Sequence, residues 1–303
     1  MSEITEAPTG LPEVAVEVLA SVAQHRMLST AQFRAIHLPE SGPRWAQRIL
    51  ARLERAGLLA HVQTPAGPRR LWYATERGAR LAQESGALEG PPRLLGPAEA
   101  AGQLQAHTLA VNDAAICFLA AARRRGDEFG PLSWRHEVAH PLVRGRGRRR
   151  RQLVADAVLT YLLVGEAEVA VEQRFLELDR ATLPVDRLAA ALARYAQLHR
   201  ARDEGDEPAW RSWYPAFPPV VCVLAGGSRA VLERRRDTLI ALLGSDPELA
   251  RAPEVAISIC LLGDLQASGP FAPIFLDVRE PEPPVKWLGE AGGAMSGDDR
   301  RRG

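Results

Sequence analysis

The sequence predicts an α/β (α+β) protein with a mixed sheet, in which an N-terminal winged helix-turn-helix precedes a larger α/β domain. Length is the first reason, because 303 residues suffice for two domains of roughly 100–200 residues each. The second is residues 11–84, where three helical segments, a hairpin and a fourth helix follow one another. The third is residues 98–279, whose expected order α-β-β-β-α-β is mixed rather than strictly alternating.

Two helical patterns follow an N-terminal segment, residues 1–10, that we expect to be disordered. Apolar residues recur at helical spacing through Leu11–Gln24, which predicts an amphipathic helix. Ser29 is a suitable N-cap for a second, shorter helix over Thr30–His37.

The third helix begins at Pro43, a residue that suits the first helical position, and Gly57 is a natural stop. We expect it to lie with one apolar side against the core. The residues of that side are Trp45, Ile49, Leu53 and Ala56.

A β-hairpin and a fourth helix complete the predicted winged helix. Leu58–Gln63 and Arg70–Ala74 are strand-like and flank the turn-rich residues 64–69. Thr75 is then the expected N-cap of a helix that runs to about Glu84.

The rest of the chain divides into a linker, the α/β domain and a tail. Residues 85–97 are rich in Gly and Pro, which predicts a linker, and residues 280–303 mix Pro, Gly and charge, which predicts disorder. Helical patterns cover residues 98–125, 185–202 and 229–243. Strand patterns cover residues 132–138, 153–163, 168–178, 219–224, 255–262 and 271–278.

Composition excludes several classes of protein. The formal net charge of +1 excludes a uniformly basic chain, so attraction for phosphate must come from locally concentrated arginine. Cys117, Cys222 and Cys260 are too far apart for a zinc-ligand pattern. With no signal-peptide pattern and no apolar run of about 18 residues, we expect a cytoplasmic protein.

Arginine is concentrated on the third helix and the hairpin. Residues 26–80 contain ten arginines against three glutamates, and the helix should present a row of them to solvent. This is the electrostatic footprint of a duplex-binding face, although a solvated face of a protein-binding winged helix gives the same pattern. The candidate DNA-binding residues are Arg44, Gln47, Arg48, Arg52, Arg55, Arg69 and Arg70.

A second basic cluster lies between the first two strands expected in the α/β domain. A projecting, glycine-interspersed loop suits phosphate contacts that do not depend on base sequence. Its arginines are Arg144, Arg146, Arg148, Arg149, Arg150 and Arg151.

Three carboxylates lie on the next two strands. Glu177 and Asp179 are two residues apart and share one face of a strand, and Asp156 falls on the neighbouring strand. They are candidates for a Mg²⁺ site, and the alternative is a set of strand-end carboxylates that face solvent or pair with an arginine such as Arg180.

Short motifs in both domains resemble known families. Residues 53–59 (LERAGLL) and 73–78 (YATERG) resemble bacterial winged-helix regulators. Residues 105–113 (QAHTLAVND), 155–158 (ADAV) and 175–182 (FLELDRAT) resemble the replication-relaxation family of actinobacterial mobile elements.

The resemblance to the replication-relaxation family implies a second domain similar to the PD-(D/E)xK, or restriction-endonuclease-like, fold. Asp156 and Glu177 match the two carboxylates that hold Mg²⁺ in that fold, and Asp179 stands where its motif has the lysine that orients water. Arg194, or Arg187 seven residues earlier on the same helical face, is then the candidate substitute cation, although arginine activates water less readily than lysine does. The candidate catalytic residues are Asp156, Glu177, Asp179 and Arg194, and the candidate metal ligands are Asp156 and Glu177. His107, within the first motif, is expected to be a packed or capping histidine rather than a base.

The combined interpretation is a DNA-binding accessory or regulatory protein of plasmid or mobile-element replication or transfer, with a degenerate nuclease-like domain. Its expected partners are double-stranded DNA, replication or transfer proteins, and a second copy of the chain. One alternative is a Mg²⁺-dependent DNA endonuclease, with Mg²⁺ as cofactor. The other is a winged-helix transcriptional regulator whose second domain serves for dimerisation.

Overall fold

The computed structural model describes residues 13–64, 67–88, 90–96, 104–142, 152–165 and 168–287. The chain divides into two compact units, Met1–Val138 with Asp156–Glu172 and Ala139–Ala155 with Gln173–Gly303. The first unit thus contains more than the predicted winged helix, because the linker, the next helix and parts of three strands belong to it.

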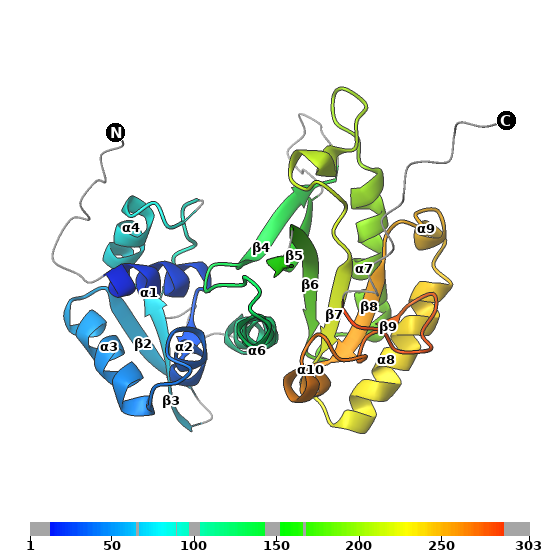
Figure 1. Ribbon diagram of the computed structural model, residues 1–303. Helices are drawn as coiled ribbons and strands as arrows, with labels where there is room; N and C mark the ends of the chain where they lie inside the picture. The colour runs from blue at the N-terminus through cyan, green and yellow to red at the C-terminus, as the bar shows by residue number, and fades with distance from the viewer. Residues whose placement is uncertain are drawn as a thin grey trace. The chain divides into compact units, whose positions relative to one another are not determined.

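The winged helix predicted for residues 11–84 is present (Figure 1). Its three strands form an antiparallel sheet in the order β1-β3-β2, with β3 in the middle. The two-residue strand β1 was not predicted, because Leu28 and Ser29 alone are too short to show a strand pattern. The elements are α1 (Glu13–Gln24), β1 (Leu28–Ser29), α2 (Thr30–His37), α3 (Pro43–Arg55), β2 (Leu59–Thr64), β3 (Gly67–Ala74) and α4 (Glu76–Glu84).

Local hydrogen bonds explain where these helices begin. Ser29 and Gln32 form a reciprocal capping box, in which each side chain accepts the other's backbone N–H at 3.1 Å. The Thr75 hydroxyl accepts the Gly78 N–H at 3.1 Å. Gly78 is required there, since a Cβ atom would lie 2.0 Å from the Leu58 carbonyl oxygen.

The apolar side predicted for α3 is partly wrong. Ala46, Leu50 and Leu53 are its buried residues, whereas the Trp45 side chain is 48 % exposed. The buried side of α3 is displaced by about one residue from the predicted side. Because the buried side contains Leu50, Trp45 lies near the solvent.

The first unit continues with α6 (Leu104–Arg125), whose Asn112 is fully buried. Its amide nitrogen donates to the Met27 carbonyl oxygen at 3.0 Å, and its amide oxygen accepts the Trp134 indole N–H at 3.1 Å. The His136 Nε2 lies 2.8 Å from the same oxygen. One buried amide thereby joins α6 to the segment between α1 and β1 and to β4.

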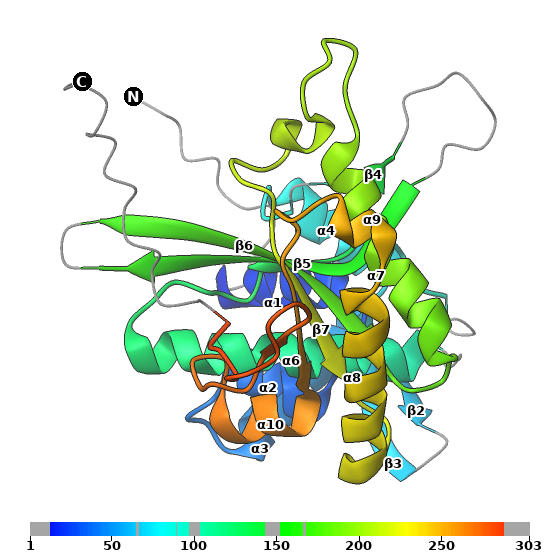
Figure 2. The same cartoon turned by 90° about the vertical axis from the view of Figure 1, so that its right-hand side faces the viewer.

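The predicted order α-β-β-β-α-β is present, and the sheet is mixed. Its strand order is β4-β5-β6-β7-β8-β9, with β6, β7 and β8 parallel and β9 antiparallel to β8. Two of the helices, α7 and α8, pack against each other (Figures 1 and 2). The elements are β4 (Trp134–Pro141), β5 (Gln152–Val164), β6 (Val169–Asp179), α7 (Val185–Arg200), β7 (Val220–Leu224), α8 (Arg229–Gly244), α9 (Pro247–Ala250), β8 (Ile257–Leu261), α10 (Leu262–Ser268) and β9 (Leu276–Asp277), with a 3₁₀ turn at Ala209–Ser212.

Two expectations for the C-terminal part need correction. The last strand is only Leu276–Asp277, shorter than the predicted 271–278. Disorder from residue 280 onward does not hold for residues 280–287: Val285 bridges to Phe275, and Trp287 is buried with the Arg174 guanidinium 5.2 Å from its ring centroid. An aromatic side chain can anchor a segment that is otherwise rich in Pro and charge.

Among the helices of the described residues, none is both long enough and apolar enough to cross a membrane.

Candidate nucleic-acid interface

The predicted row of arginines on α3 is exposed to solvent. Arg44, Arg48, Arg52 and Arg55 all lie on the side of the helix opposite its buried residues. Among the described residues, no ion pair involves any of these four side chains. The face therefore presents its positive charge outward.

The acidic residue of α3 does not neutralise this row. Glu54 lies 2.6 Å from His61 Nδ1 on β2, so its carboxylate is directed toward the hairpin. Trp45, which is exposed, has the Arg48 guanidinium 5.8 Å from its ring centroid, a cation–π contact on the surface of the helix. The face thus combines positive charge with one exposed aromatic ring.

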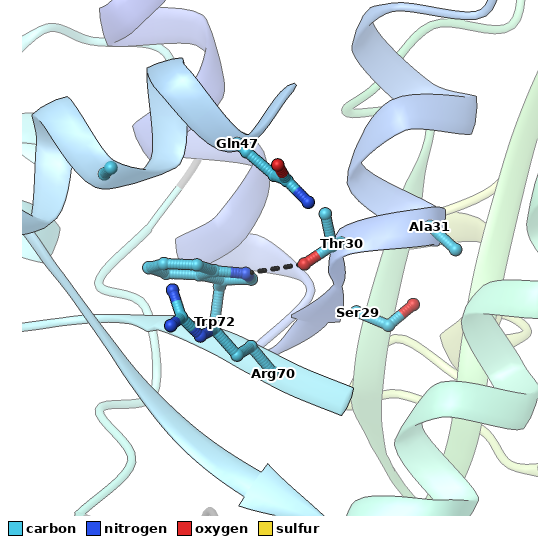
Figure 3. Close-up of a pocket in the computed structure, with 7 residues that line it drawn as sticks. Ser29, Thr30, Ala31, Gln47, Arg70 and Trp72 are labelled. Carbon is cyan, nitrogen blue, oxygen red and sulfur yellow. Dashed lines mark hydrogen bonds between the residues drawn. The ribbon is translucent and has the colours of Figure 1, made fainter. Parts of the chain in front are cut away.

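A hollow of about 740 Å³ lies between α3, the beginning of α2 and β3 (Figure 3). Gln47 projects into it from α3, and Arg70 and Trp72 come from β3. The Trp72 indole N–H donates to the Thr30 hydroxyl at 3.0 Å, which joins the hairpin to α2. A second hollow, of about 560 Å³, is lined by Arg44, Gln47, Arg48 and Ala51.

Gln47 is common to both hollows, and it is exposed like the arginines on either side of it. A glutamine amide can form paired hydrogen bonds with adenine, and an alanine methyl can contact the methyl group of thymine. Ala51, one turn after Gln47, lines the same two hollows. The exposed face of α3 therefore carries groups of the types that can bind phosphate and that can read a base.

The hairpin contributes one described arginine. Arg70 is exposed and pairs in register with Gln63 of β2, close to a β-bulge at Gln63 and Thr64. The side chain of Arg69 is outside what the structure describes. The predicted basic loop, with Arg144, Arg146, Arg148, Arg149, Arg150 and Arg151, also lies outside the described residues.

Each predicted catalytic carboxylate has a partner. Asp156 lies in the first unit, where its Oδ1 is 3.0 Å from His107 Nε2. Glu177 lies in the second unit, where it accepts the Tyr195 hydroxyl at 2.5 Å. His107 thus contacts the carboxylate that the sequence had suggested as a metal ligand.

Asp179 is buried in an ion pair that sequence analysis missed. Arg235 of α8 donates from Nε to one oxygen at 2.5 Å and from Nη2 to the other at 3.0 Å, with the two side chains 12 % and 6 % exposed. Its partner lies 56 residues away along the chain, on a helix with no motif to mark it. A positively charged side chain therefore contacts Asp179, but it is Arg235 of α8 and not one of the arginines expected on α7.

The cations expected on α7 have other surroundings. Arg194 donates to the Gln152 carbonyl oxygen at 2.6 Å, and Arg187 is exposed. Within the described ranges, no group of three or more His, Cys, Asp or Glu side chains is placed to hold a metal ion. The predicted Mg²⁺ site stays a prediction.

Comparison with known proteins gives one extensive match. The sequence model described as replication-relaxation matches residues 19–208, which is more than half of the chain. No curated protein matches the chain.

Similar solved structures cover only part of this chain. Lactococcus lactis ZitR, a zinc-responsive MarR family member, is 19 % identical with a TM-score of 0.25, over 29 % of this chain and 58 % of that one. A mutant of MarR from E. coli complexed with operator DNA is 19 % identical with a TM-score of 0.24, over 27 % of this chain and 59 % of that one. In both cases the similarity spans less than two thirds of the known structure.

Proposed function

The chain belongs to the replication-relaxation family, and from this premise we propose that it binds duplex DNA through α3 and the β2–β3 hairpin. The binding would serve replication or transfer of a plasmid or other mobile element. One observation carries the proposal: the arginines of α3 are exposed together and have no ion-pair partner among the described residues.

The physical argument begins with dimensions and charge. The major groove of B-DNA is about 12 Å wide and admits one α-helix. Arg44, Arg48 and Arg52 are each one turn apart, so a helix in the groove would direct them at phosphates along its length. Because no internal ion pair has to be broken first, phosphate contacts would release counterions at little cost to the fold.

Gln47 and Ala51 would face the base edges between these phosphate contacts. These different roles for the arginines and for Gln47 and Ala51 follow from the general rule that phosphate contacts position a protein while base contacts specify the sequence. Arg70 on β3 would contact the backbone beside the groove, with Arg69 and the loop arginines Arg144 to Arg151 as further, sequence-independent contacts.

The test is a titration of fluorescent duplex DNA with the full chain at several salt concentrations. Replacing Arg44, Arg48 and Arg52 together by Ala should weaken binding by about two orders of magnitude at low salt and reduce the slope of log K against log salt by about three. Arg80→Ala is the matched control, since Arg80 of α4 is also exposed but pairs with Glu76 at 3.0 Å. Equal affinity of the triple variant and the wild type would exclude α3 as the binding face.

For the α/β part we propose a nuclease-like module that does not cleave DNA. The support is the pairing of Asp179 with Arg235 and of Glu177 with Tyr195, which engages the side chains that the nuclease motif would use. Binding of replication or transfer proteins, formation of a homodimer and a cytoplasmic location stay predictions.

A further inference from the structure

Gln47 differs from the arginines around it on the exposed face of α3, because its side chain is polar but uncharged. It is exposed, and no hydrogen bond joins its side-chain amide to any part of the chain that the structure describes. A neutral amide releases no counterions when it contacts phosphate, so it adds little to the affinity that arginines supply. The contribution open to Gln47 is discrimination between bases.

Cationic side chains lie on two sides of Gln47. Arg70 of β3 lines the larger hollow with it (Figure 3), and Arg44 and Arg48 line the second hollow with it. These three arginines are exposed and have no ion-pair partner within the described ranges. The walls of the major groove are sugar–phosphate backbones, and its floor consists of base edges. Arginines that contact the backbones on both sides would therefore hold Gln47 over the base edges between them.

The frame that carries Gln47 is fixed by contacts on the other side of the helix. Ala46 and Leu50, on either side of it in the sequence, are fully buried. The wall of the larger hollow is fixed as well, since the Trp72 indole is hydrogen-bonded to the Thr30 hydroxyl (Figure 3). Reading a base requires a side chain on a rigid element, whereas a phosphate contact tolerates more freedom. Gln47 meets this requirement.

We propose that α3 selects a duplex site with an A·T base pair, whose adenine is bound by the side-chain amide of Gln47. This inference rests on the proposed function and names the class of sequence that this function would select. The amide oxygen can accept a hydrogen bond from the adenine N6 amino group while the amide nitrogen donates to N7. Guanine presents two acceptors at the corresponding positions and cannot form this pair of bonds.

Ala51 adds a second contact on the same face. It lines both hollows with Gln47 and follows it by one turn, about 6 Å further along the helix axis. Base pairs are stacked about 3.4 Å apart, so Ala51 would face a base pair about two steps from the one that Gln47 reads. An alanine methyl packs against the C5-methyl group of thymine. The site therefore carries adenine at one position and thymine about two base pairs away.

The alternative for this face is that an arginine reads a base. Arginine forms two hydrogen bonds with O6 and N7 of guanine, which is the commonest specific contact in protein–DNA complexes. If Arg44 or Arg48 did so, the protein would select guanine, and the selection would not depend on Gln47. The identity of the selected base and its dependence on Gln47 thus separate the two possibilities.

The test is selection of bound duplexes from a library with a randomised core by the full-length protein. We expect the wild type to enrich adenine, with thymine about two base pairs away. Gln47→Ala should lose the preference for adenine, while its affinity for random duplex stays within about two-fold of the wild type because no phosphate contact is removed. Gln83→Ala is the matched control, since Gln83 is an exposed glutamine on α4, and it should select the same site as the wild type.

Base analogues in the selected duplex then test single atoms. Replacing adenine by 7-deazaadenine removes N7 and should weaken binding of the wild type about five-fold, with no effect on Gln47→Ala. Replacing thymidine by deoxyuridine removes the C5-methyl group and should weaken binding of the wild type about three-fold, with no effect on Ala51→Gly. Each comparison is a double-mutant cycle, so a general loss of stability in a variant cancels between the two duplexes.

Failure of this inference differs from failure of the proposed function. If the wild type binds duplex DNA through the three arginines of α3 but enriches no base, only the inference is overturned. Enrichment of guanine that persists in Gln47→Ala would also overturn it, as would an equal effect of 7-deazaadenine on the wild type and on Gln47→Ala. Equal affinity of the wild type and the triple arginine variant for every duplex would overturn both.

Discussion

The winged helix (α1–α4 with β1–β3) and the carboxylate-bearing strands β5 and β6 use charged side chains in opposite ways. On α3, arginines face solvent without ion-pair partners among the described residues, and the helix is held by apolar contacts through Ala46, Leu50 and Leu53. On β5 and β6, each carboxylate with a predicted catalytic role has a partner within the protein.

This difference separates charge that is available to a ligand from charge that is already engaged within the protein. A side chain that already has a buried partner must lose it before it can contact a ligand, whereas an exposed, unpaired guanidinium loses only water and counterions. Charged side chains therefore favour a binding role on α3 and a structural role on β5 and β6. Experiments that remove single side chains can test whether the two regions differ as the contacts indicate.

The largest effect on stability is expected at the Asp179–Arg235 pair. Asp179→Ala should lower the free energy of unfolding by about 3 kcal/mol, because it leaves the Arg235 charge buried without its partner. The measurement is urea-induced unfolding at neutral pH. Arg229→Ala, on the same helix, is the control and should have a much smaller effect, since Arg229 pairs at the surface. A negligible change for Asp179→Ala would remove the structural role assigned to this carboxylate.

Acid should destabilise the winged helix through histidines that are buried in the neutral form. Burial lowers the pKa of His25 to about 3 and that of His37 to about 4. Unfolding restores ordinary values near 6.5, so the unfolded state binds the protons, and stability is complete above pH 6.5 and falls as pH decreases toward the folded-state values. At pH 5 the loss from His25 alone should be about 2 kcal/mol.

Urea unfolding between pH 7.5 and pH 5 measures this loss, in a window above the ordinary carboxyl pKa. His37→Gln should reduce the dependence on pH, since one of the two groups is removed. A constant free energy of unfolding across the window would contradict burial of His25 and His37 in the neutral form.

A smaller effect is expected where the hairpin joins α2. Trp72→Phe removes the hydrogen bond from the indole to the Thr30 hydroxyl and should lower the free energy of unfolding by about 1 kcal/mol. We expect affinity for DNA to change less than three-fold, because the arginines of α3 are unaffected. If affinity fell as far as in the triple arginine variant, the position of the hairpin would matter as much as the charge on α3.

The smallest effect, no change, is expected for cleavage. Wild type, Asp156→Ala and Glu177→Ala should all nick supercoiled plasmid at the background rate with Mg²⁺ or Mn²⁺, because the three carboxylates are engaged with His107, Tyr195 and Arg235. Robust nicking by the wild type that both substitutions abolish would establish the endonuclease and reverse the comparison between the two regions.

Much of the fold follows from local sequence. The helices α2 and α3 begin where Ser29 and Pro43 predict, and the long strands β5 and β6 have strong β patterns. Short elements such as β1 and α10 could not be predicted, since two or seven residues carry too little periodicity. Trp45 was placed on the wrong side of α3 because it continues the helical spacing of Ile49 and Leu53, although Leu50, one position from the predicted stripe, fills the core instead.

The candidate DNA face was predictable and the partners of the carboxylates were not. A row of arginines at helical spacing determines a face from the sequence alone, once the helix is recognised. Arg235 reaches Asp179 from another helix, and Arg26 reaches Glu137 from 111 residues away. Contacts between residues so far apart along the chain depend on tertiary packing, which local patterns do not report.

The position of β3 between β1 and β2 has a geometric consequence. Ser29 is at once the partner of Leu71 in the sheet and the cap of α2, so the base of the hairpin and the helix pair are joined at a single residue. A second contact between the hairpin and α2 lies one residue further along each segment, where the Trp72 indole N–H donates to the Thr30 hydroxyl. The fold itself therefore fixes the spacing between α2 and the hairpin, and under the proposed function the two would meet a duplex as one rigid unit.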